Sequence, residues 1–227
     1  MTNLYNLLLP SMKHIKFVPK TSYVTNSILF KSVLIYGKIG SGKSEIYRSF
    51  VEKAVKKYGI ENVNAQYVTK GKYLRYLLEY GLDNKLIQCL FVDDATLSKI
   101  PKDVMEDYFR IRHKWYELTN RPYGYILSFI AAHRFYGVHL SLRSDNDTYI
   151  FLTSPTSPFD RSVTKKYIGE EGIARLQFFE EQRSKRLNSK YKSYSIFNAR
   201  GQTGTLIAKL ARRSYMSEVR VPICRFM

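Results

Sequence analysis

Apolar positions along the chain follow two spacings, one typical of strands and one typical of helices. Residues 33–36 form a short apolar run, whereas residues 43–58 repeat an apolar side chain every four positions, at Ile46, Phe50, Ala54 and Tyr58. A continuous run predicts a buried strand, and a four-residue spacing predicts a helix with one apolar face. Gly59 follows as a capping residue. The pattern therefore predicts a strand, a loop and a helix in succession.

The same alternation continues toward the end of the chain. Residues 86–92 are apolar except for Gln88, which is typical of a parallel strand covered on both faces. We also expect strands at 65–69, 125–132 and 149–153, helices at 73–80, 101–118 and 170–187, and a strand pair at 194–198 and 205–210. This order predicts an α/β fold, with a mainly parallel sheet, helices on both faces and a C-terminal β-hairpin.

The length and composition predict one main domain. A chain of 227 residues with 44% apolar types is long enough to close one sizeable core. We expect that domain at residues 32–210, preceded by an N-terminal segment at 1–31 and followed by a basic tail at 211–227. The longest nearly unbroken apolar stretch, at 125–132, is far shorter than the ~20 residues that cross a bilayer, so we expect no membrane span.

A phosphate-binding motif lies between the first strand and the first helix. Residues 37–44 read G-K-I-G-S-G-K-S, which fits the P-loop pattern in the context that the motif requires. Its backbone N–H groups would turn toward phosphate oxygens at the helix N-terminus. Lys43 would reach the β- and γ-phosphates of ATP, and Ser44 would offer its hydroxyl to Mg²⁺. The expected nucleotide contacts are Gly37, Lys38, Ile39, Gly40, Ser41, Gly42, Lys43, Ser44 and Glu45.

Two carboxylates directly follow the strand predicted at 86–92. Asp93 is placed to support the metal ion together with Ser44, because such an acid ends a neighbouring strand in P-loop sites. Asp94 would polarise the water that attacks the γ-phosphate, although a surface or capping carboxylate is an almost equally good interpretation. The sequence thus predicts an ATP and Mg²⁺ site with Asp94 as a candidate catalytic residue.

The net charge points to a polyanionic partner. The chain carries 37 Lys and Arg against 19 Asp and Glu, a formal charge of +18, and residues 161–227 alone contain 15 basic and 5 acidic side chains. A field of that size attracts nucleic acid. Only two cysteines are present, so neither a disulfide framework nor a zinc cluster is indicated, which fits a reducing cytoplasm.

The segment N-R-P-Y-G-Y-I-L-S-F-I-A-A-H-R-F, at residues 120–135, resembles the FtsK/HerA class of DNA-pumping ATPases. The order of motifs is similar to that of compact members that package viral genomes. The resemblance implies that Lys43 and Ser44 bind phosphate and metal, and that Asp93 supports the metal. It places Asp94 where the class has a catalytic glutamate, and His133 where it has a sensor glutamine.

The resemblance also implies how subunits and partners cooperate. Arg121 matches an arginine that acts on the phosphoryl group of a neighbouring subunit, and Arg134 and Arg143 compete for that role. Several copies would form a ring, expected to be a hexamer, that binds ATP at subunit junctions and double-stranded DNA in a central channel. For a viral protein, the expected partner is a capsid or portal component and the expected location is the host cytoplasm.

Three other functions remain open from the sequence. An AAA+ replication initiator or loader of the DnaA type is also basic, but it needs a helical lid where 194–210 reads as strands. A small nucleotide kinase shares the phosphate motif, but the charge of +18 argues against it. A nucleotide-gated DNA-binding protein that hydrolyses ATP too slowly to pump is suggested by Asp94 in place of glutamate.

Overall fold

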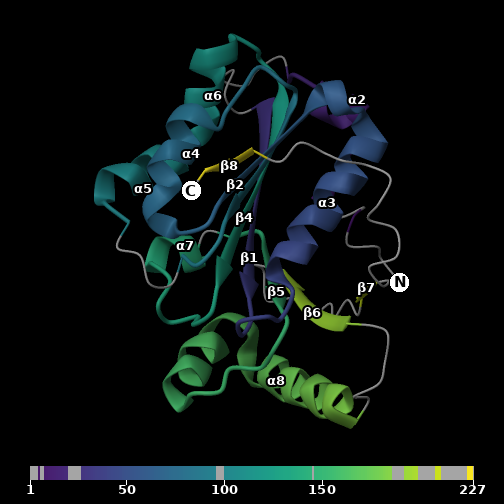
Figure 1. Ribbon diagram of the computed structural model, residues 1–227, viewed down its shortest axis with the longest axis vertical. Helices are drawn as coiled ribbons and strands as arrows, with labels where there is room; N and C mark the ends of the chain where they lie inside the picture. Colours follow the sequence, from purple (N-terminus) through teal and green to yellow (C-terminus); the bar gives the residue numbers. More distant parts are fainter. Residues whose placement is uncertain are drawn as a thin grey trace.

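Figure 1 shows a computed structural model of the chain. It describes residues 5, 8–19, 27–95, 100–144 and 146–185, with residues 179 and 182–185 by their backbone alone. The strands at 192–198, 208–210 and 224–226 are likewise described by their backbone alone.

A parallel sheet forms the centre of the molecule (Figure 1). Five strands are parallel to one another in the order β5-β1-β4-β3-β2. Their bounds are β1 Ile28–Tyr36, β2 Val63–Val68, β3 Ile87–Val92, β4 Gly124–Ala132 and β5 Thr148–Phe151. The expected mainly parallel α/β sheet is therefore confirmed, and β1, the strand that leads into the phosphate motif, lies inside it between β4 and β5.

Three further strands extend the sheet at its two edges. The strand β6, Lys192–Asn198, pairs antiparallel with β5, and β7, Ala208–Leu210, pairs antiparallel with β6. This pair is the expected C-terminal hairpin. At the other edge β8, Cys224–Phe226, pairs parallel with β2. The sequence pattern did not predict β8, which falls within the residues expected as a basic tail.

Helices cover both faces of the sheet, as expected (Figure 1). On one face lie α2, Met12–Ile15, and α3, Lys43–Tyr58. On the other lie α4, Leu74–Tyr80, α5, Lys102–Phe109, and α6, Ile111–Thr119. The short α7, Leu140–Ser144, follows β4, and the long α8, Pro158–Lys185, lies beyond the carboxyl ends of the strands. Short 3-10 turns span Ile60–Asn62 and Gly71–Tyr73.

The sheet separates two apolar cores. All nine positions of β4 are buried, and they alternate between the cores, with Leu127 and Phe129 toward α3 and Ile126 and Ile130 toward α5 and α6. This double coverage explains why the strands read as apolar runs without polar alternation. Cys89 of β3 is fully buried, and burial raises the pKa of its thiol to about 12, so it packs as a small apolar side chain.

Two expected helices differ from the structure. The helix expected at 101–118 is broken into α5 and α6 at Arg110, whose φ of −94° and ψ of 14° leave the helical region. The break lets Trp115 enter the core, where its Nε1 donates to Asp83 O at 2.9 Å. The helix expected at 170–187 is the second part of α8, which begins at Pro158 and is interrupted at Gly169, with φ 72° and ψ 176°.

The N-terminal segment packs against α3. Leu8, Leu9 and Ile15 are buried in the core on that face, and Tyr58 of α3 donates a hydrogen bond to Pro10 O at 2.6 Å. Because β1 begins at Ile28, the boundary expected after residue 31 falls inside this strand. None of the helices in the described ranges has both the length and the apolar character needed to cross a bilayer.

Candidate nucleotide-binding site

The phosphate loop connects the carboxyl end of β1 to the first turn of α3. Gly37 N donates to Ala132 O at 3.1 Å, and Ser41 N donates to Lys38 O at 3.1 Å, which folds the loop back on itself. Gly40 and Gly42 have φ values of 74° and 95°, a left-handed conformation that glycine adopts without strain. The first amides of α3 point out of the helix with no intrahelical acceptor. The sequence motif therefore forms a cradle for an anion.

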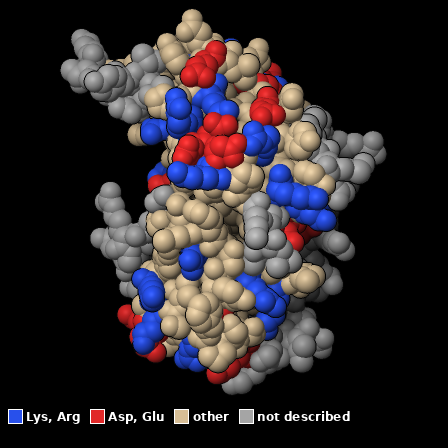
Figure 2. Space-filling view, turned by 90° about the vertical axis from the view of Figure 1, so that its left-hand side faces the viewer, with Lys and Arg blue, Asp and Glu red and all other residues tan. Residues whose placement is uncertain are grey.

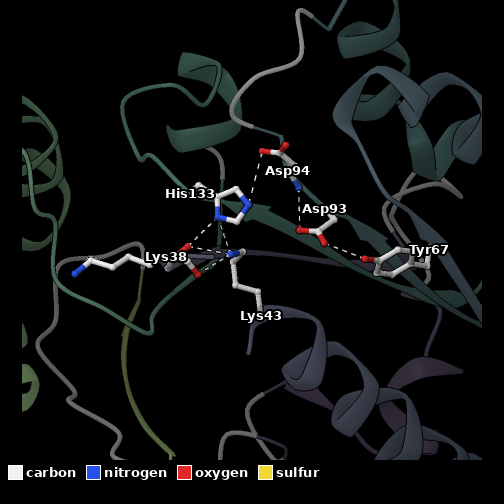
Figure 3. A network of polar contacts seen from close by, with 7 residues as sticks. Lys38, Lys43, Tyr67, Asp93, Asp94 and His133 are labelled. Atoms are coloured by element: carbon white, nitrogen blue, oxygen red, sulfur yellow. Dashed lines mark hydrogen bonds and ion pairs between the residues drawn. The ribbon is translucent and has the colours of Figure 1, made fainter. Parts of the chain in front are cut away.

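Lys43 occupies the centre of this cradle (Figure 3). Its Nζ donates to Gly37 O at 2.9 Å and to Lys38 O at 3.1 Å, and the residue is only 5% exposed. Burial lowers the pKa of this ammonium group, while the carboxylates of Asp93 and Asp94 oppose the shift. A further negative charge beside Lys43, such as a phosphate group, would relieve the cost of burying it.

Asp93 is held rigidly at the end of β3. Its Oδ1 accepts from Asp94 N at 2.9 Å, and its Oδ2 accepts from Tyr67 Oη at 2.9 Å. Its own N donates to Val68 O at 2.8 Å, which ties it to β2. Sequence reasoning missed Tyr67, because nothing along the chain links this β2 tyrosine to an aspartate on the next strand. The carboxylate of Asp93 thus has a fixed place beside the cradle.

Asp94 takes an unusual backbone conformation. Its φ is 46°, one of two positive values at non-glycine residues in the described part of the chain. Its Oδ1 is buried, lacks a hydrogen-bond partner among the residues that the structure describes, and lies 3.9 Å from His133 Nε2. A buried acceptor without a donor is costly. This oxygen is therefore suited to accept a hydrogen bond from a water molecule in the site.

His133 bridges the lysine and the second aspartate (Figure 3). Its Nδ1 lies 2.9 Å from Lys43 Nζ and 3.2 Å from Gly37 O, and its Nε2 faces Asp94. The ammonium group of Lys43 can only donate to Nδ1, whereas Gly37 O can only accept from it, so the two contacts on Nδ1 require different tautomers of the ring. The residue expected as a sensor is thus in contact with the phosphate-loop lysine.

The remaining loop residues have different surroundings. Ser44 is half-buried in the first turn of α3, whereas Glu45 forms an ion pair with Arg48 at 3.2 Å. The Lys38 side chain pairs with Glu180 of α8 at 3.4 Å, and Ile39 is 86% exposed at the tip of the loop. Glu45 and Lys38 are therefore engaged by the chain itself, while their backbones remain part of the cradle.

The oxygen groups of this site fit a magnesium ion bound with a nucleotide. Mg²⁺ takes hard oxygen ligands and is commonly held by one or two protein groups together with phosphates and water. The Ser44 hydroxyl and the fixed Asp93 carboxylate supply such oxygens. In the described ranges no group of three or more His, Cys, Asp and Glu side chains could hold a metal on its own. A metal ion at Ser44 and Asp93 would therefore need further ligands, such as phosphate oxygens and water.

The three candidate arginines lie in different places. Arg121 precedes β4, while the cradle lies beyond the carboxyl ends of the strands, so the nine residues of β4 separate them by about 30 Å. Arg121 therefore does not reach the site of its own chain. Arg134 directly follows His133, is exposed and donates to Tyr136 Oη at 3.1 Å. Arg143 is half-buried in α7, with its Nε buried.

Comparison with known proteins gives matches at the level of structure. No protein-family model matches the chain, and no curated protein matches its sequence. The fold is similar to the genome packaging NTPase B204 from Sulfolobus turreted icosahedral virus 2 in complex with ATP-gammaS. That match has a TM-score of 0.50 and 13% identity, and covers 80% of this chain and 97% of B204.

A second structure of the same viral protein, in complex with AMP, gives the same result. Its TM-score is 0.50 at 13% identity, over 78% of this chain and 96% of B204. At this identity the likeness describes the fold and leaves the roles of single residues to be tested. The resemblance to compact viral genome-packaging NTPases, first indicated by the sequence, is thus confirmed for the fold of this P-loop α/β protein.

Proposed function

We propose that this protein is an ATPase that moves double-stranded DNA, in the manner of a viral genome-packaging motor. The observation that carries the proposal is the contact chain from Lys43 through His133 to Asp94 at the mouth of the phosphate cradle. A glycine-rich turn that only caps a helix would not need a buried lysine, a histidine and two carboxylates around it. The B204 structures with ATP-gammaS and AMP support a nucleotide as the ligand.

In the proposed reaction each side chain has a separate task. Lys43 would exchange its bonds to Gly37 O and Lys38 O for phosphate oxygens. Ser44 and Asp93 would hold a magnesium ion, which neutralises charge on the phosphate groups when bound. Asp94 Oδ1 would accept a hydrogen bond from the attacking water and orient it. His133 would act as the sensor of the γ-phosphate. Its contact with Lys43 already holds it beside the group that would bind that phosphate.

Double-stranded DNA is the proposed partner because the positive charge is concentrated. Apart from Lys43, which lies buried in the cradle, the helices α2 and α3 carry five Lys and Arg against two Asp and Glu. On the opposite face α4, α5 and α6 carry four basic and five acidic side chains. Figure 2 shows that opposite face, where the two signs lie side by side. We therefore propose that phosphates of DNA contact the α2–α3 face, which needs no base recognition.

The assembly is proposed to be a hexameric ring with ATP at the subunit junctions. Arg121 does not reach the cradle of its own chain, so it would act on the nucleotide of a neighbouring subunit. Arg134 is the competing choice, since it is exposed at the carboxyl edge of the sheet beside His133. A capsid or portal component of a virus would be the docking partner, and the host cytoplasm would be the location.

One other function is favoured by a specific observation. Asp94 stands where the resembling class has glutamate, and its shorter side chain would hold water less closely to the phosphate. A nucleotide-gated DNA-binding protein with very slow hydrolysis follows from this difference. The replication initiator with a helical lid is disfavoured, because β6 and β7 follow the core as strands.

ATP hydrolysis by the assembled protein, with and without duplex DNA, tests the proposal. We expect Lys43→Ala to lose nucleotide binding, because the buried ammonium group is removed. Asp94→Asn should retain binding and lower kcat at least ~100-fold. Lys102→Ala is the matched control, since Lys102 is exposed on α5 and pairs only with Glu106 among the ion pairs of the described residues.

The outcomes separate the possible errors. Normal hydrolysis by Asp94→Asn would show that the catalytic assignment is wrong. Absence of hydrolysis by the unaltered assembly, with and without DNA, would overturn the ATPase function. Hydrolysis without any movement along DNA would favour the nucleotide-gated protein.

A further inference from the structure

The long helix α8 touches the nucleotide site at two separate points. Its first part contacts the loop that carries His133, and its second part contacts the phosphate loop at Lys38. We propose that α8 is a positioning element for catalysis, in which Asp160 fixes the sensor histidine and Glu180 fixes the phosphate loop. The proposal rests on the ATPase function given above and adds two residues outside the P-loop and the β3 aspartates.

Asp160 joins the His133 loop to the first turn of α8. It is a buried carboxylate, only 3% exposed, and both of its oxygens are used. Oδ1 accepts from Tyr136 N at 2.9 Å, three residues after His133, and Oδ2 accepts from Tyr36 Oη at 3.2 Å. Burial, and next the Asp160 charge, raise the pKa of Tyr36 well above its usual value, so its hydroxyl remains a donor.

Aromatic packing makes this junction stiff. Phe135, fully buried, lies 6.3 Å from the Tyr36 ring, 5.7 Å from Phe151 and 5.2 Å from Tyr167 of α8. Tyr136 meets Phe159 of α8 edge to face at 5.0 Å. The two residues after Arg134 are therefore held between β1, β5 and α8. His133 is connected to this clamp by a single intervening residue, so the clamp restrains the backbone from which the His133 ring projects.

Glu180 ties the second part of α8 to the phosphate loop. Its carboxylate accepts from Ser154 N at 3.1 Å and from the Ser154 hydroxyl, and it pairs with Lys38 Nζ at 3.4 Å. Burial opposes its ionisation, but the bonds from Ser154 and Lys38 outweigh that effect and lower the pKa of Glu180. Lys38 N also donates to Thr153 Oγ1 at 3.3 Å, so the start of the loop is held on this side.

The two contacts act on different parts of the site. The Glu180 contact sets the cradle that binds the phosphates, whereas the Asp160 contact sets the side chain that meets the γ-phosphate. Gly169, with φ 72°, separates the two parts of α8, so each can follow its own contact. Loss of the Glu180 carboxylate should therefore weaken nucleotide binding. Loss of the Asp160 carboxylate should slow the chemical step while nucleotide binding is preserved.

Steady-state kinetics of four variants test this separation. We expect Asp160→Asn, which retains one acceptor oxygen, to lower kcat about tenfold and to change KM for ATP less than twofold. Glu180→Gln should raise KM about fivefold with kcat nearly unchanged. Ile168→Val is the control for lost packing in the first part of α8, and Glu171→Gln is the control for a lost ion pair, with Arg175.

A purely structural role for α8 predicts a different result. If Asp160→Asn and Ile168→Val lower the melting temperature equally and change kcat equally, Asp160 does not position His133. If Glu180→Gln leaves KM unchanged, or Glu171→Gln raises it as much, Glu180 does not position the phosphate loop. Either pair of results would overturn that part of the proposal.

A second measurement does not need ATP hydrolysis. The chain has four histidines, so ¹⁵N-histidine NMR resolves each imidazole, with His133→Gln assigning its signal. Asp160→Asn should shift the ring resonances of His133 and leave those of His14 and His113 in place, while Ile168→Val shifts none. An unchanged His133 signal would overturn the proposal even if the unaltered protein hydrolyses ATP. Absence of hydrolysis together with the expected shift would count against the proposed function alone.

Discussion

Asp94 shows how a backbone conformation selects a side chain. A φ of 46° is in the left-handed region, where aspartate and asparagine are enriched because their short polar side chains bond locally. The class that this chain resembles has glutamate at the corresponding place. The positive φ of Asp94 therefore favours aspartate over glutamate at this position.

We expect Asp94→Glu to lower the free energy of unfolding by about 1 kcal/mol, because glutamate adopts a left-handed conformation less readily than aspartate. Asp94→Asn and Asp94→Gly should be about as stable as the unaltered protein, since both residues adopt positive φ readily. Urea unfolding of the three variants measures the order. If Asp94→Glu proves as stable as Asp94→Asn, the positive φ at this position does not explain why the residue is aspartate.

The site residues that could be predicted from the sequence belong to short continuous motifs. Gly37 to Ser44 and Asp93 follow from neighbours in sequence, and the structure places them around one cradle. Tyr67, Asp160 and Glu180 were missed because each acts through a residue far along the chain. Glu45 belonged to the predicted contacts by position alone, and the structure pairs its side chain with Arg48.

At the scale of elements, the pattern identified strands better than helix ends. The apolar runs predicted the strands β1 to β5, because a strand that is buried on both faces has apolar residues at nearly every position. The break at Arg110 was not predictable, since the apolar spacing is the same across α5 and α6. The break accompanies the burial of Trp115, whose Nε1 donates to Asp83 O and whose ring lies against Gly124 of β4, later in the chain.

Gly124, the first residue of β4, offers a test of this packing. A Cβ atom at this position would lie 2.4 Å from the ring of the fully buried Trp115. We expect Gly124→Ala to lower the free energy of unfolding by about 1–3 kcal/mol through overpacking. Combined with Trp115→Phe, whose smaller ring leaves room, the alanine should cost less. Strictly additive effects in this double-mutant cycle would show that the two positions do not compete for space.

At the scale of the whole molecule, the charge is unevenly placed on the two faces of the sheet. The net charge of +18 follows from the sequence, but only the fold shows that α2 and α3, on one face, carry more basic than acidic side chains, whereas the charges of α4, α5 and α6 on the other face nearly balance. The hairpin of β6 and β7 was predicted from local signals, whereas β8 pairs with β2 from the other end of the chain, a contact that no local pattern reports. The order of the strands in the sheet likewise could not be predicted from the sequence.

The proposed DNA surface can be tested by charge reversal. Lys53→Glu with Lys56→Glu should weaken duplex DNA binding about tenfold near 0.15 M salt and flatten its salt dependence, because both lysines are exposed on α3. ATP hydrolysis without DNA should stay unchanged. Lys72→Glu with Lys102→Glu is the matched control, with the same change in net charge on the opposite side of the sheet. Equal loss of DNA binding in both double variants would show that binding depends on the net charge of the protein and that DNA does not bind a particular face.

The central place of β1 has a consequence for how the protein is made. Its register joins Val33 to Phe129 of β4 and to Thr148 of β5, so both neighbours are synthesised about a hundred residues later. Pairings that distant form slowly, since a long loop must close first. On the ribosome the phosphate loop emerges early, yet it acquires its rigid base only when β5 has left the exit tunnel. A nascent chain that ends before β5 should therefore be unable to bind a nucleotide.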